Sequence, residues 1–233
     1  MNLFEEQYRA LRTQGAQAWA GEGYARAKKQ QEQIFAWLQL NHYLPVPGAS
    51  VLELGCGNGA MAAQSLAERG YSVWGVDFSE TAIKWAEALF QQEKLSAQFL
   101  MGDVCHLSQL QNSMFELIID GSCLHCLVNE ARPGCFSEVR RLLTPTGRFV
   151  ISSMCGSPRN PEDIARYDPE NHHLLRNGQP WRTLKPFQVL LDEVQSAKFT
   201  VLATQVHKNP WWDHATIVCQ PVCSPGTFPR YGI

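Results

Sequence analysis

Residues 51–59 read Val-Leu-Glu-Leu-Gly-Cys-Gly-Asn-Gly, an apolar stretch with one acidic residue that runs directly into a loop with glycine at every second position. Glycine tolerates positive φ and has no Cβ, so Gly55, Gly57 and Gly59 let the chain turn sharply out of a strand and approach a ligand closely. The stretch predicts a strand and a ligand-binding loop at the start of an α/β fold. With Ala60, the loop also satisfies the dinucleotide fingerprint G-x-G-x-x-G/A.

Short apolar runs alternate with amphipathic segments along the rest of the chain, which is typical of a parallel sheet flanked by helices. Strands are predicted at residues 50–54, 73–77, 98–101, 115–120 and 147–154. Helices are predicted at 60–69, after the N-cap Ser79, at 132–143, where Pro145 ends the helix, and around 187–194. Runs at 199–206 and 214–219 are joined by a short connection, so we expect them to pair antiparallel.

The composition suits one globular domain, because 233 residues with 45% hydrophobic and 18% charged side chains can build a sizeable core. Residues 1–48 are helical in character and form an N-terminal cap, and residues 49–154 hold the alternating core. Residues 155–185 are rich in Gly, Pro, Asn, Arg and His without an apolar period, which indicates a lid-like insertion. Residues 186–233 hold the last helix, the strand pair and a tail.

Charge and cysteine usage favour a cytoplasmic protein without a nucleic-acid or membrane partner. Twenty basic and 22 acidic residues give a formal charge of −2, with no long run of either sign. The first residues lack a signal pattern, and no apolar stretch approaches the roughly 18 to 20 residues of a membrane span. The eight cysteines should then be thiols. Cys123 and Cys126 have no matching second pair and His172-His173 stands alone, so no metal site is predicted.

Acidic residues recur at the ends of the predicted strands, where a doubly wound sheet binds its ligand. Glu53 nearly ends the first strand, Asp77 ends the second, Asp103 follows the third and Asp120 ends the fourth. A carboxylate after the second strand can accept hydrogen bonds from both ribose hydroxyls, which serves any adenosine ligand. A row of acids suits a cationic sulfonium better than a pyrophosphate.

Five segments in order resemble the motifs of class I S-adenosylmethionine-dependent methyltransferases, namely residues 51–59, 73–79, 102–104, 115–120 and 141–152. The resemblance implies a Rossmann-like, three-layer α/β fold with a seven-stranded, mostly parallel sheet and an antiparallel last strand. Thr146 stands where the family more often has a second glycine in the turn before the fifth strand.

The resemblance also implies S-adenosyl-L-methionine as the cofactor and S-adenosyl-L-homocysteine as the product. The glycine loop is expected beside the methionine part, Asp77 at the ribose, and Asp103 with Val104 at the adenine. The residues expected to bind the cofactor are Glu53, Gly55, Cys56, Gly57, Asn58, Gly59, Asp77, Phe78, Gly102, Asp103, Val104 and Asp120.

Methyl transfer is a direct displacement at a carbon that the sulfonium activates, so alignment and desolvation of the nucleophile can supply much of the acceleration. A protonated acceptor needs a base, and His125, just past the fourth strand, is the candidate for a base or an acceptor-orienting group. Otherwise His125 only opens the next helix. Cationic and aromatic side chains suit a small acceptor with a carboxylate or another anion. The acceptor-binding candidates are Trp19, Tyr24, Arg159, Tyr167, His172 and Arg182, with His173 and Trp181 beside them.

The leading interpretation is therefore a methyltransferase that acts on a small-molecule acceptor. An NAD-dependent oxidoreductase is permitted by the glycine loop and Asp77, but no second domain with a hydride-transfer constellation follows the sheet. A non-catalytic S-adenosylmethionine-binding protein is the third alternative. The acceptor atom and the oligomeric state are open at this stage.

Overall fold

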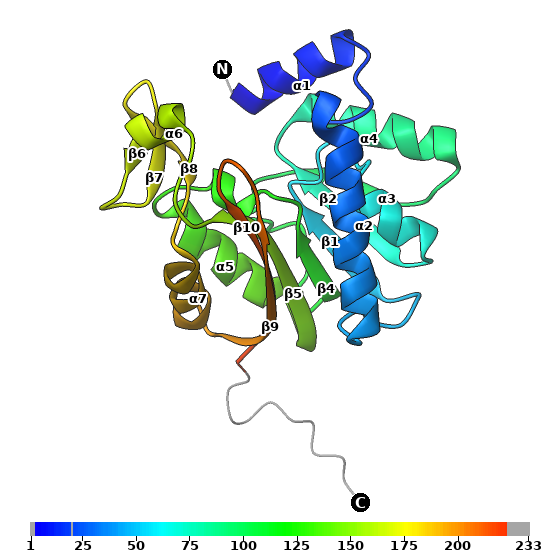
Figure 1. The fold of residues 1–233 in the computed structure, drawn as a ribbon. Helices are drawn as coiled ribbons and strands as arrows, with labels where there is room; N and C mark the ends of the chain where they lie inside the picture. Colours follow the sequence, from blue (N-terminus) through cyan, green and yellow to red (C-terminus); the bar gives the residue numbers. More distant parts are fainter. Residues whose placement is uncertain (1–2, 20, 223–233) are drawn as a thin grey trace, which may run out of the picture.

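The computed structural model describes residues 3–19 and 21–222. Its centre is a seven-stranded sheet with the strand order β3-β2-β1-β4-β5-β10-β9 (Figure 1). β1 to β5 pair in parallel, whereas β10 is antiparallel to β5 and to β9. The strands are Ser50–Leu54 (β1), Ser72–Asp77 (β2), Gln98–Met101 (β3), Phe115–Asp120 (β4), Leu143–Cys155 (β5), Phe199–Lys208 (β9) and Asp213–Pro221 (β10). The predicted sheet with its antiparallel last strand is confirmed.

Helices cover both faces of this sheet and complete the three layers (Figure 1). They are Leu3–Thr13 (α1), Tyr24–Leu40 (α2), Ala62–Glu68 (α3), Glu80–Glu93 (α4), Ala131–Leu142 (α5), Pro161–Ala165 (α6) and Phe187–Ser196 (α7), with short 3-10 helices at Gly21–Gly23 (η1) and Leu124–Cys126 (η2). Val51 packs in one core with α2 and α3, whereas its neighbour Leu52 packs in the other core with α5 and α7. The alternation follows from the two-residue period of a strand.

Local sequence signals explain most element boundaries. The Ser79 side chain accepts a hydrogen bond from the Ala82 N–H at 3.0 Å and caps α4, as predicted. The helix predicted at 60–69 begins later, at Ala62. Pro145 does not end α5 as expected: the helix ends at Leu142, and Pro145 lies within β5 near the irregular start of its pairing with β4. Proline is tolerated there because irregular pairing does not require its missing N–H.

The segment 155–185 has regular structure that its lack of apolar periodicity did not reveal. It contains α6 and a three-stranded antiparallel sheet of Tyr167–Asp168 (β6), His173–Arg176 (β7) and Gln179–Thr183 (β8). Asn177 and Gly178 both have positive φ, 52° and 73°, at the turn between β7 and β8. An Asn-Gly pair with this conformation is a strong hairpin signal. The unit has its own small core around Leu174 and Leu184.

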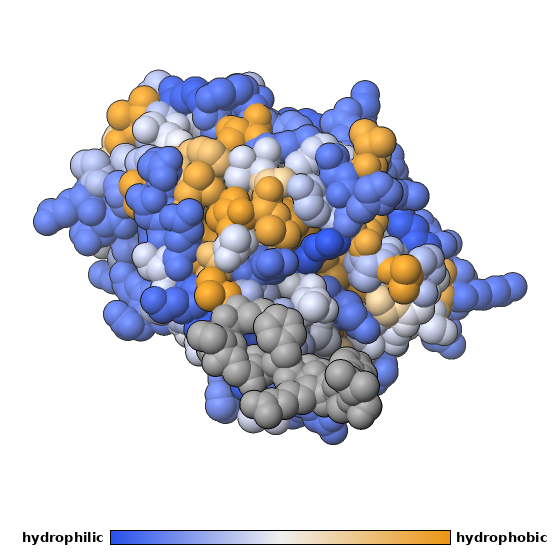
Figure 2. Space-filling model, turned by 90° about the horizontal axis from the view of Figure 1, so that it is seen from below, coloured by the Kyte–Doolittle hydropathy of each residue, from blue (hydrophilic) through white to orange (hydrophobic). Residues whose placement is uncertain are grey.

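The lower face in Figure 1 lies at the edge where the parallel strands begin. Seen from below in Figure 2, this face gathers apolar residues near its middle, with polar residues around them. α1 lies at the opposite edge, above the carboxyl ends of the strands (Figure 1). The predicted thiol Cys223 and the rest of the tail after residue 222 lie outside the described residues. Within the described ranges, no helix has both the length and the hydropathy of a membrane span.

Candidate active site

A cavity of about 700 Å³ opens at the carboxyl ends of the parallel strands. Its walls come from the ends of β1, β2, β4 and β5, from the loops that follow β3 and β4, and from α1, α2, β8 and the β9–β10 turn. Of the predicted site residues, the cavity brings together Trp19, Glu53, Gly55, Asp77, Phe78, Gly102, Asp103, Val104, Asp120, His125 and Arg182. This is the position at which doubly wound sheets bind their ligands.

The glycine loop needs glycine for two separate reasons. Gly55 and Gly57 have φ values of 65° and 54°, which a residue with a Cβ adopts only with strain. A Cβ on Gly55 would also lie 2.3 Å from the Cβ of Cys123, and a Cβ on Gly57 would lie 3.0 Å from the Tyr8 hydroxyl. The loop is therefore pressed between the segment after β4 and the N-terminal helix.

Of the predicted loop residues 55–59, Gly55 lines the cavity, whereas residues 56–59 lie away from it. The Cys56 N–H donates to the Val76 carbonyl at 2.9 Å, which joins the loop to β2. The buried Asn58 side chain donates to the Gln17 carbonyl at 3.0 Å. Residues 56–58 thus fix the shape of the loop, whose cavity side is kept free of side chains at Gly55.

Three buried carboxylates lie in a row across the sheet. Glu53, Asp77 and Asp120 are 1%, 4% and 1% exposed. Burial raises the pKa of Glu53 to about 8 and that of Asp120 to about 6, and it also raises the pKa of Asp77. Within the described part of the chain, none of the three forms a salt bridge with a lysine, arginine or histidine. A cationic ligand would supply the missing countercharge.

The backbone fixes each of these carboxylates. Glu53 accepts the Ala63 N–H at 2.7 Å, and Asp77 accepts the N–H groups of Gly57 and Ser79, both at 3.0 Å. Asp120 accepts three N–H groups, from Cys123 at 2.7 Å, Leu124 at 2.9 Å and Ser152 at 3.2 Å. Asp120 therefore holds η2 and β5 together. Asp77 anchors the glycine loop, and Glu53 anchors α3. Asp103, by contrast, is exposed, and its carboxylate accepts the Cys105 N–H.

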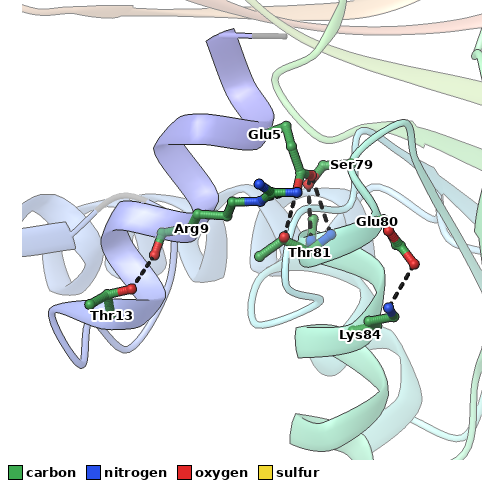
Figure 3. A network of polar contacts seen from close by, with 8 residues as sticks. Glu5, Arg9, Thr13, Ser79, Glu80, Thr81 and Lys84 are labelled. Atoms are coloured by element: carbon green, nitrogen blue, oxygen red, sulfur yellow. Dashed lines mark hydrogen bonds and ion pairs between the residues drawn. The ribbon is translucent and has the colours of Figure 1, made fainter. Parts of the chain in front are cut away.

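α1 closes one side of the cavity through contacts with the end of β2 and the start of α4. The Glu5 carboxylate accepts the hydroxyls of Ser79 at 2.5 Å and Thr81 at 2.6 Å, and it also pairs with Arg9 at 2.7 Å (Figure 3). The two hydroxyl hydrogen bonds lower the pKa of Glu5 to about 2. An acidic side chain at a helix N-terminus is also favoured by the helix dipole.

Two aromatic residues of α1 reach the cavity itself. The Tyr8 hydroxyl donates to Oδ2 of Asp77 at 3.4 Å, and burial raises the pKa of Tyr8 far above its ordinary value. Phe4 packs edge-on against Phe78 with ring centroids 5.8 Å apart. α1 thus covers the acidic row at Asp77, the residue predicted to bind a ribose.

The opposite half of the cavity is basic and aromatic. His125, on η2, is 6% exposed, and burial together with the charge of Arg182 lowers its pKa well below the ordinary value. His214, at the start of β10, has its pKa lowered to about 4 by burial. Arg182 of β8 stacks on Trp181 at 4.2 Å. Both histidines are therefore neutral at pH 7, and arginine supplies the positive charge.

A methyltransferase-domain family model matches residues 51–147, which include β2 to β4, β1 except its first residue, the glycine loop and all four strand-end acids. Over residues 51–147 the chain is therefore similar to a methyltransferase domain, in agreement with the resemblance of its motifs to class I S-adenosylmethionine-dependent methyltransferases. The arsenite methyltransferase of Halobacterium salinarum is 30% identical over 54% of this chain and 32% of its own length. The human EEF1A lysine methyltransferase 2 is 29% identical over 65% of this chain and 64% of its own.

The fold of this chain also matches solved structures. The 1,6-didemethyltoxoflavin-N1-methyltransferase of Burkholderia thailandensis, solved with 1,6-didemethyltoxoflavin and S-adenosylhomocysteine, superposes with a TM-score of 0.69 at 21% identity. The match covers 94% of this chain and 87% of that one. The chain spans about a third of the length of the arsenite enzyme and less than two thirds of the lysine enzyme, with 32% and 64% of each covered.

Four of the predicted acceptor-binding residues lie outside the walls of this cavity. Tyr24 begins α2 and donates to the Ala60 carbonyl at 3.3 Å. Arg159 donates to the Asn209 carbonyl and to Asp213, both at 2.5 Å, and so ties the insertion to the β9–β10 turn. Tyr167 donates to the Leu184 carbonyl at 2.9 Å and contacts His172 in the turn before β7, so both residues make their contacts within the insertion. Of these four residues, Arg159 ties the insertion to the rest of the chain.

The structure adds site residues that the sequence did not single out. They are Tyr8, Arg26, Trp211, Trp212 and His214, which all line the cavity. One signal was available for the last three: β9 runs parallel to β5, so the turn that follows it must lie at the carboxyl edge of the sheet. Tyr8 and Arg26 gave no local signal, because their places depend on how α1 and α2 pack.

The positions with metal-ligand chemistry are also accounted for. Cys123 and Cys126 are free thiols beside the cavity, and burial raises the pKa of both. In residues 3–19 and 21–222, no group of three or more His, Cys, Asp and Glu side chains is arranged to hold a metal ion.

Proposed function

We propose that this protein transfers the methyl group of S-adenosylmethionine to a small-molecule acceptor. One observation carries the proposal: a single cavity joins a row of buried carboxylates to a chamber with a neutral histidine and an arginine, and neither the carboxylates nor this arginine forms a salt bridge within residues 3–19 and 21–222. The first half fits a cationic cofactor, and the second half fits an acceptor that must be positioned and deprotonated.

The residues proposed to hold the cofactor are those expected from the family. Gly55 leaves room beside the loop, and Glu53 and Asp77 supply negative charge. The wall beyond the ends of β2 and β3 consists of Phe78, Gly102, Asp103 and Val104. Cys56, Gly57, Asn58 and Gly59 shape the loop, and Asp120 fixes the segment after β4. When bound, S-adenosylmethionine supplies a methyl carbon that its sulfonium makes electrophilic.

His125 is the proposed base or acceptor-orienting residue. Asp120 accepts the N–H groups of Cys123 and Leu124, and Arg132 donates to the Leu124 carbonyl at 2.6 Å, so η2 is held rigidly from both sides. The Nδ1 atom of His125 is sealed from solvent and has no hydrogen-bond partner in the described structure. Nε2 is therefore the nitrogen through which the neutral imidazole can accept a proton from an acceptor.

The walls of the cavity support a small acceptor. Trp19, Trp211, Trp212 and Arg182 line it together with α1 and α2, so an acceptor would be largely enclosed. The human relative is named a lysine methyltransferase, which makes a protein acceptor the second candidate. The acidic row disfavours the pyrophosphate of NAD. The cytoplasmic location and the absence of a nucleic-acid partner stay predictions.

Calorimetric titrations with S-adenosylhomocysteine and NAD test the cofactor. We expect micromolar binding of S-adenosylhomocysteine, binding weakened at least about tenfold in Asp77→Asn, and unchanged binding in the control Asp192→Asn, whose side chain is exposed on α7. Thermal unfolding of Asp77→Asn distinguishes a lost contact with the cofactor, which leaves the melting temperature unchanged, from a disrupted glycine loop, which lowers it. Tighter binding of NAD than of S-adenosylhomocysteine would contradict the proposal.

Turnover tests the reaction itself. Labelled S-adenosylmethionine should transfer its methyl group to members of a panel of small hydroxyl, amine and thiol compounds. Transfer to none of them, but to proteins in a cell extract, would favour the protein acceptor. Binding of the cofactor without transfer to either would favour the non-catalytic alternative.

A further inference from the structure

Charge is segregated inside the cavity. The carboxylates Glu53, Asp77 and Asp120 belong to the ends of β1, β2 and β4, on one side of the strand order. The arginines that line the cavity are Arg182, on β8, and Arg26, on α2. A cationic cofactor bound along the acidic row leaves the basic half to the second substrate. The basic half therefore reports on the chemistry of the acceptor.

Arg182 differs from Arg159 and Arg166 in having no acidic partner among the described residues. Arg159 pairs with Asp213 at 2.5 Å and Arg166 with Glu162 at 2.8 Å, both from the same insertion. Arg182 has no salt bridge to any carboxylate in the described ranges. Its Nε is sealed from solvent without a partner, and its Nη1 has only the Met154 sulfur at 3.9 Å.

An unpaired, partly buried guanidinium is unfavourable unless a ligand completes it. Stacking on Trp181 at 4.2 Å orients the plane of the Arg182 guanidinium but provides no counterion. Its donors form a fixed fork that matches two oxygens of a carboxylate or phosphate. The fork therefore has the geometry and the charge to bind an anionic group in a wall of the cavity.

The two neighbouring histidines add polar contacts without charge. His125 and His214 both line this half, and the Nδ1 atom of each is buried without a partner. Because they are neutral, they do not repel a cation or attract an anion by themselves, and the arginines determine the sign of the site.

We propose that the acceptor carries a carboxylate or phosphate group and that Arg182 binds this group, with His125 facing the atom that is methylated. The proposal rests on the methyltransferase function proposed above. It has a consequence for the base: the charge of Arg182 is one cause of the low pKa of His125. An anion bound to Arg182 cancels that charge, so His125 becomes a stronger base when the acceptor is in place.

Binding of simple anions to the protein saturated with S-adenosylhomocysteine tests the inference. The probes are benzoate, phenyl phosphate and neutral benzamide, titrated by calorimetry. We expect benzoate or phenyl phosphate to bind at least about tenfold more tightly than benzamide, and the preferred anion identifies the group. Arg182→Gln should lose this preference, whereas the matched control Arg166→Gln, exposed in the same insertion, should keep it.

The affinity for S-adenosylhomocysteine separates the two proposals. If Arg182→Gln binds S-adenosylhomocysteine like the wild type, its binding of anions can be measured directly. If it does not, Arg182→Lys is used instead. This variant keeps the positive charge but loses the two-pronged guanidinium, so it should bind the anions more weakly than the wild type. Equal binding of benzamide and both anions, or full anion binding by the Arg182 variant that retains the cofactor, overturns the inference. Failure of the wild type to bind S-adenosylhomocysteine overturns the proposed function instead.

Discussion

Cofactor binding should expel a proton from Glu53. This carboxyl is 1% exposed, and burial raises its pKa to about 8, so about nine tenths of it is protonated at pH 7 in the ligand-free protein. We propose that the ammonium group of the cofactor lies beside it. A cation at that place favours the carboxylate, so binding and deprotonation are coupled.

The raised pKa of Glu53 determines how protein stability and cofactor affinity change with pH. The folded, ligand-free protein holds the Glu53 proton between the ordinary pKa of 4.5 and about 8, so its stability falls as pH rises through this window. Cofactor binding favours the ionised form, so affinity rises with pH and levels off above about 8. If Glu53 is fully ionised in the complex, affinity increases about 50-fold from pH 6 to pH 8, which corresponds to about 2.3 kcal/mol, with about 0.9 protons released at pH 7.

Calorimetry in buffers of different ionisation enthalpy measures the released proton directly. S-Adenosylhomocysteine should release about 0.9 protons from the wild type at pH 7 and close to none from Glu53→Gln. The variant should bind almost like the wild type at pH 6, where Glu53 is protonated, and much more weakly at pH 8. The control Glu87→Gln, exposed on α4, should behave like the wild type. An undiminished proton release in Glu53→Gln would refute the assignment, because another group would then be titrating.

Three further predictions concern α1, the base and the glycine loop. Glu5→Gln should weaken the contacts of α1 with Ser79 and Thr81 and lower the free energy of unfolding by about 1 kcal/mol. Amide hydrogen exchange should become faster in α1 and stay unchanged in β1. His125→Asn should lower kcat about 100-fold and leave the affinity for S-adenosylhomocysteine unchanged; equal kcat values would exclude a base. Gly55→Ala should destabilise the protein by more than about 3 kcal/mol in denaturant titrations, because its Cβ meets that of Cys123 at 2.3 Å. Gly15 also has a positive φ, 70°, but a Cβ there would meet no atom within 4 Å, so Gly15→Ala is the control. An equal loss of stability in both variants would mean that the positive φ, and not the contact with Cys123, destabilises Gly55→Ala.

The sheet could be predicted because its signals are local. β1, β3 and β4 have the predicted boundaries. β1 and β4 are short apolar runs that are buried in the sheet, whereas β3 is its partly exposed edge strand. The hairpin at Asn177-Gly178 was missed, because its strands are too short to show an apolar period. The position of Pro145 inside β5 was missed because the helix and the strand follow each other without a turn.

The acidic half of the site was also accessible from the sequence, because a strand end places Glu53, Asp77 and Asp120 at one edge whatever else the chain does. The basic half was accessible only in part. Arg159 and Arg182 looked alike in the sequence, yet Asp213 neutralises the first and no described carboxylate pairs with the second. Such a difference depends on residues more than fifty positions apart.

The sequence by itself determined the glycine loop, the acidic residues at the strand ends and the succession of strands along the chain, because each arises from neighbouring residues and from the periods of strands and helices. Only the tertiary structure decided that Tyr8 donates to Asp77, that His214 and Trp211 line the same cavity as Arg182, and that this arginine pairs with no carboxylate of the described residues. These contacts join α1, β2, β8 and the β9–β10 turn, and no local pattern encodes which side chains meet when distant segments pack.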